Sequence, residues 1–423
     1  MMAMMLFSFL GLLLLGVPIA FSLGIASMLY IVLTDMPLVL IGQRVFSGVD
    51  SFVLLAIPAF MLAGNLMNTG GITKRILKFC TAIVGHIRGS LAQVNVISSM
   101  LFAGISGTAI SDVVSLGSMV IPAMEEDGYE PEFAAALTAS TSIMGPIIPP
   151  SVPMVIAGSA VSISVGGMFA GGILPGILLG LLFMMQVYFI AKKRNYPKHR
   201  KHTLVEILVT TKESIFALLM PLILMGGILG GFFTPTEAAV VTVSYALIVG
   251  VVIYRELRFS HIFRAVTTTM RSAASILLLI GLASVFANIL VQERVPQAIA
   301  NSILGFTDNS ILVILIINVI LLFTGMFMES IAAILIMFPV LLPIATGVGM
   351  SPLQFGVMAV LNLMIGLITP PVGICLATAG QIAKVPLWKA IVANMPFLLT
   401  LIVVLLLVAF VPPLTMWLPG LIN

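Results

Sequence analysis

The chain has 423 residues, of which 60% are hydrophobic and only 8% are charged. This composition lies far outside the globular range, so it excludes an ordinary water-soluble domain and predicts an all-α integral membrane protein. The sequence lacks a Walker A pattern, a zinc-protease motif and an ordered Ser/His/Asp set, which excludes ATP-driven transport by this chain and hydrolytic catalysis, and we predict that it is not an enzyme.

The N-terminal part begins with an apolar run at about residues 4–33. Gly16-Val17-Pro18 within it either kinks the run or divides it into two short helices. A second apolar segment covers about residues 52–68. From Ile72 to Arg88, apolar residues recur at helical spacing between basic ones, which predicts an amphipathic helix on the cytoplasmic surface.

The apolar run from Ser90 to Met124 is interrupted near its middle by Gly104-Ile105-Ser106-Gly107-Thr108. A single span does not need glycines and hydroxyls at its centre, so we predict two helices that form a re-entrant hairpin. A second interrupted helix follows at about residues 133–164, with the break Gly145-Pro146-Ile147-Ile148-Pro149-Pro150. Proline donates no N–H and clashes with the carbonyl four residues earlier, so the double proline should free the carbonyls of Gly145 and Pro146.

A full span at about residues 168–191 leads into a strongly basic loop. Its cations are Lys192, Lys193, Arg194, Lys198, Arg200 and Lys201. Basic loops between membrane spans lie on the cytoplasmic side. We therefore assign this loop to the cytoplasm and expect no nucleic-acid partner.

The second half repeats the same kinds of element. Its expected segments are spans at about 214–231, 236–254 and 271–290, a short surface helix at 295–304, an interrupted run at 310–345 with Thr324-Gly325 at its centre, a broken helix at 353–383 and a last span at 391–418. The second broken helix carries Gly366-Leu367-Ile368-Thr369-Pro370-Pro371.

The two halves are an internal repeat. Adding 221 to the numbering of the first hairpin and broken helix places seven glycines and prolines on the same residue type. Among these, Gly104 falls on Gly325, Gly145 on Gly366, and Pro149-Pro150 on Pro370-Pro371. Because an odd number of crossings separates the two hairpins, they should enter from opposite faces. Inverted repeats with broken helices are typical of secondary transporters.

The repeated motifs resemble those of a known transporter family. The hairpin tip Ser106-Gly107-Thr108-Ala109, the break Gly145 to Ser151 and its partner Thr369-Pro370-Pro371-Val372-Gly373 are similar to the large membrane subunit of tripartite ATP-independent periplasmic (TRAP) transporters. The resemblance covers essentially the whole chain and includes members that carry sialic acid.

The resemblance implies sodium-driven import of an organic acid across the bacterial inner membrane by a multi-pass protein. A periplasmic binding protein would deliver the substrate, which is sialic acid, a C4-dicarboxylate or a similar carboxylate. A small four-helix membrane subunit would brace this one, and because no such domain precedes Met1 we expect it to be a separate chain. An elevator mechanism is also implied, in which a transport domain slides against a scaffold.

On this plan the chain divides into alternating scaffold and transport segments. The expected segments are 1–89 (scaffold helices and cytoplasmic surface helix), 90–165 (first transport repeat), 166–308 (scaffold helices, basic loop and second surface helix), 309–385 (second transport repeat) and 386–423 (C-terminal span).

Two sodium sites are expected, one at each break, because Na⁺ prefers oxygen ligands and broken helices present free carbonyls. The residues of the first site are Gly104, Ser106, Gly145, Ile148 and Pro150; those of the second are Thr324, Gly325, Gly366, Thr369 and Val372. The structural alternative is that these glycines only permit close helix packing.

Further polar residues lie where the broken helices flank a central space. The candidates for substrate binding are Thr141, Ser142, Ser151, Asn362, Asp112 and Glu329. Carboxylates inside apolar runs are functional candidates by default. Asp112 and Glu329 are candidates to bind a further cation or the hydroxyls of the substrate, and capping of half-helices is an equally good explanation. Hydroxyl and amide groups that bond to their own helix are the corresponding alternative for the others.

We therefore predict the large subunit of a sodium-coupled organic-acid importer. The first alternative is a sodium/dicarboxylate or citrate carrier that works without a binding protein. The second is a channel or a structural membrane scaffold, of which saturable sodium-driven uptake is not expected.

Overall fold

The computed structural model describes residues 1–307 and 309–422, in which every regular element is a helix. The first half contains α1 (Met2–Leu14), α2 (Ile19–Leu33), α3 (Val39–Val49), the 3-10 helix η1 (Phe52–Leu55), α4 (Ala56–Thr69), α5 (Ile72–Val84), α6 (Ser90–Ser106), α7 (Ala109–Glu126), α8 (Pro131–Ser142), α9 (Val152–Val161) and α10 (Val165–Arg194). The second half contains α11 (Leu204–Leu229), α12 (Pro235–Leu247), the π-helix η2 (Ile248–Ile253), α13 (Phe259–Gln292), α14 (Val295–Phe306), α15 (Ser310–Phe327), α16 (Ser330–Gly347), α17 (Pro352–Gly366), α18 (Ile374–Ile382), α19 (Leu387–Phe410), α20 (Pro413–Met416) and α21 (Pro419–Ile422).

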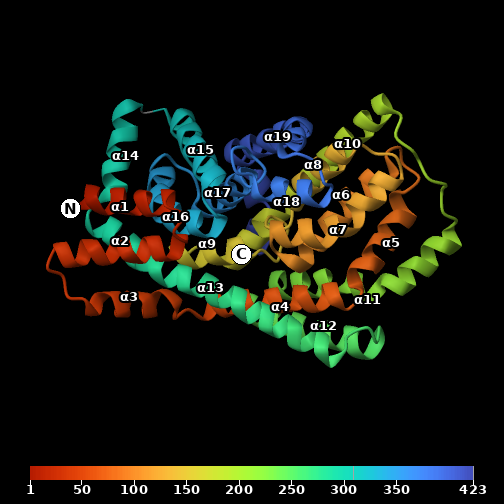
Figure 1. Cartoon of the computed structure of the whole chain (residues 1–423), viewed down its shortest axis with the longest axis horizontal. Coiled ribbons are helices and arrows are strands. Elements are labelled where there is room, and N and C mark those ends of the chain that lie inside the picture. The colour runs from red at the N-terminus through yellow and green to blue at the C-terminus, as the bar shows by residue number, and fades with distance from the viewer. Residues whose placement is uncertain (308, 423) are drawn as a thin grey trace.

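Eight helical segments of the described residues are long and apolar enough to cross a membrane. Together with the shorter apolar helices of the hairpins and breaks, they confirm the all-α membrane class (Figure 1). The predicted domain boundary at residue 308 and the last residue, 423, lie outside the described residues.

The helix boundaries follow the repeat predicted from the glycines and prolines. With the offset of 221, α7 (Ala109–Glu126) falls on α16 (Ser330–Gly347), and the starts of α8 and α17 coincide. The first hairpin turns at Gly107-Thr108 and the second at the equivalent Met328-Glu329. Two hairpins and two broken helices are therefore present, at matching places in the two halves.

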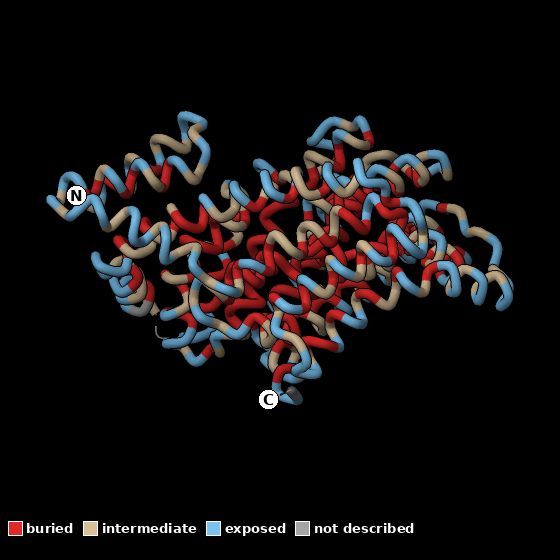
Figure 2. Tube along the Cα trace, turned by 90° about the horizontal axis from the view of Figure 1, so that it is seen from below, coloured by how far each residue is buried: buried red, intermediate tan, exposed pale blue. Residues whose placement is uncertain are grey.

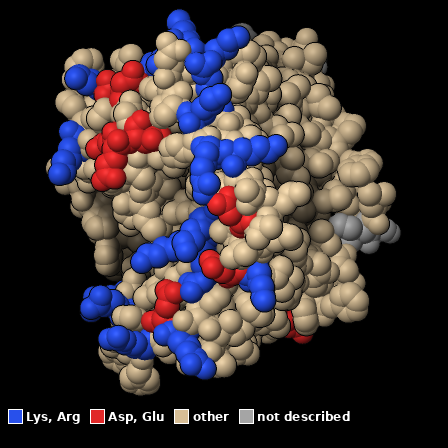
Figure 3. Space-filling view, turned by 90° about the vertical axis from the view of Figure 1, so that its right-hand side faces the viewer, with Lys and Arg blue, Asp and Glu red and all other residues tan. Residues whose placement is uncertain are grey.

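The two hairpins approach the centre from opposite sides. In Figure 1, α6 and α7 lie in the right half, near the loop that joins α10 to α11, whereas α15 and α16 lie in the left half, where α16 packs against α14. Lys and Arg side chains gather on the right-hand face (Figure 3). Since basic loops mark the cytoplasmic side, the right-hand face is cytoplasmic and the repeats are inverted, as the odd number of crossings predicted.

The broken helices form the core of the molecule. All residues of α17 from Gln354 to Gly366 and of α8 from Phe133 to Ser142 are buried, and buried segments fill the middle of Figure 2. α8 packs against α7, α18 and α19, and α17 against α15, α16 and α19. On one side of this core, α2, α3, α4 and α16 all contact the long helix α13.

The N-terminal part of the fold selects one of two predicted alternatives and contains one helix that was not predicted. The N-terminal run is divided at Gly16, whose φ is +80°, into α1 and α2, which decides between the two alternatives. Residues 39–49 form α3, which the sequence analysis missed because Gln43 and Arg44 interrupt its apolar pattern. This helix has no fully buried residue and packs on α13.

The break of the second hairpin also lies four residues later than Thr324-Gly325. Thr324 and Gly325 belong to the last turn of α15. The chain turns at Met328-Glu329 because the Glu329 carboxylate accepts the N–H groups of Ile331 and Ala332 and so begins the next helix.

Candidate transport site

The first break is seated on the tip of the first hairpin. The Val152 N–H donates to the Gly107 carbonyl at 3.2 Å. Gly107 has φ +65°, and a Cβ there would approach the Pro150 carbonyl oxygen to 2.7 Å, so only glycine suits this position. The hairpin tip and the break that the sequence analysis assigned to one site are therefore in contact.

Three carbonyls predicted for the first ion site remain free in this arrangement. None of the described backbone N–H groups outside the helices bonds to the carbonyl oxygens of Gly104, Gly145 or Ile148. The Pro146 carbonyl, by contrast, accepts the Ser151 hydroxyl at 2.5 Å. Ser151 also caps α9 by accepting the Met154 N–H at 3.2 Å, so its hydroxyl has a structural role within the break.

Asp112, one of the candidates for substrate binding, lies beside the residues predicted for the first ion site. The Ser106 hydroxyl donates to Asp112 Oδ1. The carboxylate is 1% exposed, and its Oδ2 has no hydrogen-bond partner among the described residues. A Cβ on Gly145 would collide with that oxygen. A buried carboxylate oxygen without a donor is costly unless a cation or a proton satisfies it.

At the second predicted site, two backbones are in close contact, and the threonine hydroxyls bond to carbonyls four residues earlier in the chain. A Cβ on Gly366 would approach Gly325 Cα to 2.6 Å, so the hairpin and the broken helix meet backbone to backbone. The Thr324 hydroxyl donates to the Ile320 carbonyl at 2.8 Å and the Thr369 hydroxyl to the Ile365 carbonyl at 2.7 Å. Val372 is 43% exposed, so only its backbone carbonyl can serve as an inward ligand.

One carbonyl of the second break is satisfied by another helix. Asn394 of α19 donates from Nδ2 to the Ile368 carbonyl at 3.0 Å and accepts the Ser140 hydroxyl of α8 at 2.6 Å. All three groups are buried. Asn394 thus links the second break to the first broken helix. The sequence around Asn394 does not predict this role, because its partners lie 26 and 254 residues away.

Asn394→Ala should lower the free energy of unfolding by about 1–3 kcal/mol, because it leaves the Ile368 carbonyl and the Ser140 hydroxyl buried without a partner. The measurement is the thermal unfolding midpoint of the detergent-purified protein. Thr346→Ala is the control, since the exposed Thr346 hydroxyl bonds only to carbonyls of its own helix. Equal midpoints for the two variants would contradict this role of Asn394.

Thr141, Ser142 and Asn362, which were predicted to bind substrate, all take part in hydrogen bonds within the protein. Thr141 donates to Asn95 Oδ1 at 3.3 Å, and Asn362 donates to Asn318 Oδ1 at 2.8 Å. The Ser142 hydroxyl bonds to the Ala139 carbonyl in its own helix. All three residues are buried. The bonds of Thr141 and Asn362 hold each broken helix against the first helix of its own hairpin. The hydroxyls of Thr141 and Ser142 therefore have structural partners, whereas Asn362 Oδ1 is buried without a hydrogen-bond partner among the described residues.

A cavity of about 520 Å³ lies instead where both hairpin tips face α4 and α13. Of the predicted site residues, Ser106 and Glu329 line it. Its other polar lining residues are Asn65, Asn68, Thr108, Ser111, Ser115, Thr268, Ser272 and Ser330. Glu329 Oε2 accepts the Ile331 N–H at 2.9 Å and the Ala332 N–H at 3.2 Å, which is the capping alternative.

The cavity offers one open helix end to an anion. The lining residues include neither Lys nor Arg. Glu329 caps α16 and Ser151 caps α9, whereas Thr108 at the start of α7 makes no side-chain cap bond. Thr108, Ala109, Ile110 and Ser111 all line the cavity. The first turn of α7 also contains Asp112, so this helix end favours a further carboxylate only when a cation or a proton neutralises that group.

Comparison with known proteins gives consistent matches along the whole chain. The family described as "Tripartite ATP-independent periplasmic transporter, DctM component" matches residues 6–414. The sialic acid TRAP transporter large permease protein SiaM of Vibrio cholerae is 42% identical, over 98% of this chain and 97% of that protein. The C4-dicarboxylate large permease protein DctM of the same organism is 37% identical, over 97% and 96%.

Two further comparisons bear on length and on fold. The isethionate TRAP transporter permease protein DctMQ of Oleidesulfovibrio alaskensis is 39% identical, but this chain spans only 64% of its length. The solved structure of the Alcanivorax borkumensis YdaH transporter, described as having an unusual topology, aligns over 89% of this chain and 88% of that one with a TM-score of 0.62. At 15% identity, that likeness concerns the fold alone.

Proposed function

The chain belongs to the DctM family of TRAP transporter large permeases, and from this membership we propose that it couples the import of an organic acid to a sodium gradient. It is a multi-pass inner-membrane transport subunit rather than an enzyme. Large permeases of this family associate with a small permease subunit and a periplasmic binding protein. The observation that carries the proposal is the buried Asp112 Oδ2, which has no hydrogen-bond partner among the described residues and lies against Gly145 of the first break.

We propose that the first sodium ion binds between the first hairpin tip and the first break. Its ligands would be Asp112 Oδ2, the Ser106 hydroxyl and the carbonyls of Gly104, Gly145 and Ile148. Oxygen atoms are the ligands that a hard cation prefers. The Ser106 hydroxyl donates to Asp112 and keeps its lone pairs for the ion.

The second sodium ion would bind at the second break, with the Thr369 hydroxyl and the carbonyls of Gly366 and Val372 as ligands. The Gly366 carbonyl also accepts the Thr369 N–H at 3.1 Å, so it would offer the ion its second lone pair. Thr369 donates its proton to the Ile365 carbonyl, so its oxygen lone pairs face away from that bond. Thr324 and Gly325 would contribute from the hairpin side.

The substrate would occupy the 520 Å³ cavity. Its carboxylate would bind the open N-terminus of α7, and its hydroxyl or second carboxylate groups would bond to Asn65, Asn68 and Ser272. The names of the relatives make sialic acid and C4-dicarboxylates the first substrates to test. A cavity lined by neither Lys nor Arg, with the Glu329 carboxylate engaged in capping α16 and one helix end open, suits weak, reversible binding of an anion better than a bidentate arginine clamp does.

The division into scaffold and transport segments supports an elevator. The hairpins and broken helices would move together, because Asn394 and the Asn95 and Asn318 bonds tie them to one another. α4 and α13 would remain fixed in the scaffold. We propose that the small subunit is a separate chain, since the relatives that this chain covers almost fully are named large permease proteins.

Reconstitution tests this function directly. Proteoliposomes with this chain, its small subunit and the binding protein should take up labelled N-acetylneuraminate or succinate only when external sodium is present, and not when choline replaces it at constant pH. Uptake by this chain without the other two components would favour the stand-alone carrier instead. Sodium-independent, non-saturating flux would favour a channel.

Thr369→Ala should weaken the apparent sodium affinity by about tenfold, the cost of one lost oxygen ligand. Thr378→Ala is the matched control, because its hydroxyl makes the same bond, to the Ile374 carbonyl at 2.8 Å, but lies outside the break. The measurement is the sodium concentration for half-maximal uptake. A value unchanged from wild type in Thr369→Ala would remove the hydroxyl from the site.

A further inference from the structure

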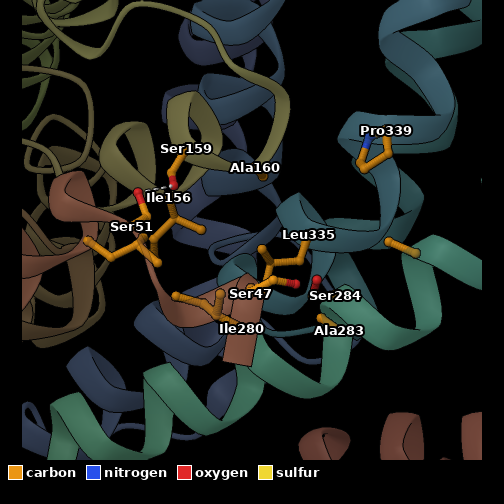
Figure 4. Close-up of a pocket in the computed structure, with 13 residues that line it drawn as sticks. Ser47, Ser51, Ile156, Ser159, Ala160, Ile280, Ala283, Ser284, Leu335 and Pro339 are labelled. Atoms are coloured by element: carbon orange, nitrogen blue, oxygen red, sulfur yellow. Dashed lines mark hydrogen bonds between the residues drawn. The ribbon is translucent and has the colours of Figure 1, made fainter. Parts of the chain in front are cut away.

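A second cavity, of about 260 Å³, lies on the same interface between scaffold and transport segments. Its scaffold walls come from α3, η1 and the C-terminal half of α13, and its other walls from α9 and α16. Four serines line it: Ser47, Ser51, Ser159 and Ser284. In Figure 4, Ser47 and Ser284 point toward each other, and the Ser159 hydroxyl donates to that of Ser51 at 3.4 Å.

The two cavities are related by the internal repeat. With the offset of 221, Ser47 falls on Thr268 and Ser51 on Ser272; with the offset of 223 that relates α5 to α14, Met61 falls on Ser284 and Gly64 on Ala287. In each of these pairs, one member lines the serine cavity and the other lines the central cavity. Equivalent segments of the scaffold therefore build both cavities.

The cavities lie at two levels along α13. Thr268 and Ser272 face the central cavity, and Ser284 and Ala287 face the serine cavity. At about 1.5 Å per residue, Ser272 and Ser284 are roughly 18 Å apart along the helix axis. The C-terminal half of α13 leads away from the basic face toward α14 (Figure 1). The serine cavity is thus on the periplasmic side of the central one.

We propose that the serine cavity is a second binding position, here called the second station, for the transported organic acid. It would face the hairpin tips when the transport segments lie closer to the periplasm. This inference rests on the proposed function. Both stations present uncharged hydroxyl or amide groups on the scaffold, whereas the open N-terminus of α7 travels with the transport segments. The carboxylate therefore keeps one partner throughout, and the scaffold exchanges one set of neutral hydrogen bonds for another.

Cross-linking tests the position of the second station. In the reconstituted complex with Cys80→Ala and Cys375→Ala, Ser330→Cys is combined either with Ser272→Cys or with Ser284→Cys. Ser330 and Ser272 line the same cavity in this structure, so a bifunctional thiol reagent long enough to cross the cavity should link that pair, which serves as the positive control. The same reagent should also link the Ser330/Ser284 pair, and added sodium with N-acetylneuraminate or succinate should change the yield of that link.

Filling the cavity tests its contact with substrate. Ala287→Leu narrows the serine cavity and should lower uptake at least about tenfold while leaving the Ser330/Ser272 cross-link intact. Ala274→Leu, the same change on an exposed face of α13, should transport normally. A Ser330/Ser284 pair that never cross-links in an active complex, or wild-type uptake by Ala287→Leu, would overturn the second station. Absence of uptake by the wild-type complex would instead overturn the proposed function and this inference with it.

Discussion

The Asp112→Asn variant is expected to lose sodium-driven uptake at physiological sodium concentrations. Asparagine has nearly the same volume, and its carbonyl oxygen can still accept the Ser106 hydroxyl at the position of Oδ1. The amide nitrogen replaces Oδ2, however, and points two N–H donors at the place of the cation. Loss of a charged ligand and the added repulsion should weaken apparent sodium affinity about a hundredfold, equivalent to roughly 3 kcal/mol.

Thermal unfolding of the same variant distinguishes an effect on sodium binding from an effect on folding. Because Oδ2 has no partner among the described residues, replacing the carboxylate removes a buried charge and should not lower the thermal unfolding midpoint measured without sodium. With saturating sodium, the wild type should gain stability by ligand binding and the variant should not. Glu126→Gln, an exposed carboxylate on the same helix, is the control. Unchanged sodium activation in Asp112→Asn would leave the carbonyls alone as candidate ligands.

The sequence indicates the breaks because their cause is local. A double proline removes hydrogen bonds at known positions whatever surrounds it, so Pro149-Pro150 and Pro370-Pro371 locate both broken helices. The offset of 221 then places the hairpins, and the odd number of crossings gives their opposite entry. The prediction that the second hairpin turns at Thr324-Gly325 was wrong, because Gly325 permits close contact with Gly366 and does not end α15.

The cavity was not predictable in the same way. Asn65 and Ser272 are more than 200 positions apart, and neither stands out from the other polar residues of its helix. Only the packing of α4 and α13 against the hairpin tips brings them together. Conversely, Thr141 and Asn362 have the polarity and repeat symmetry expected of ligands. Their partners Asn95 and Asn318 lie more than 40 residues away, and this pairing is invisible in the sequence. It occupies the Thr141 hydroxyl and the Asn362 amide nitrogen, while Asn362 Oδ1 has no partner among the described residues.

The close contact between hairpin and broken helix in the second repeat leads to the other large effect. Gly366→Ala should abolish uptake and destabilise the protein, because the added Cβ would lie 2.6 Å from Gly325 Cα and 2.5 Å from its carbonyl oxygen. Backbone atoms at the end of one buried helix cannot move aside as a flexible side chain does. Overpacking of this kind costs about 1–3 kcal/mol or more, and the displaced hairpin would also open the second ion site.

Gly347→Ala is the matched control for this prediction. Gly347 also ends a helix of the second repeat, but a Cβ there meets nothing within 4 Å, so the change should be neutral or slightly stabilising. Thermal midpoints and sodium-dependent uptake of the two variants are measured side by side. If Gly366→Ala keeps the wild-type thermal midpoint and the wild-type sodium-dependent uptake, the hairpin and the broken helix separate easily. The second sodium site would then not depend on their contact, and Thr369 with the break carbonyls would have to form it without the hairpin.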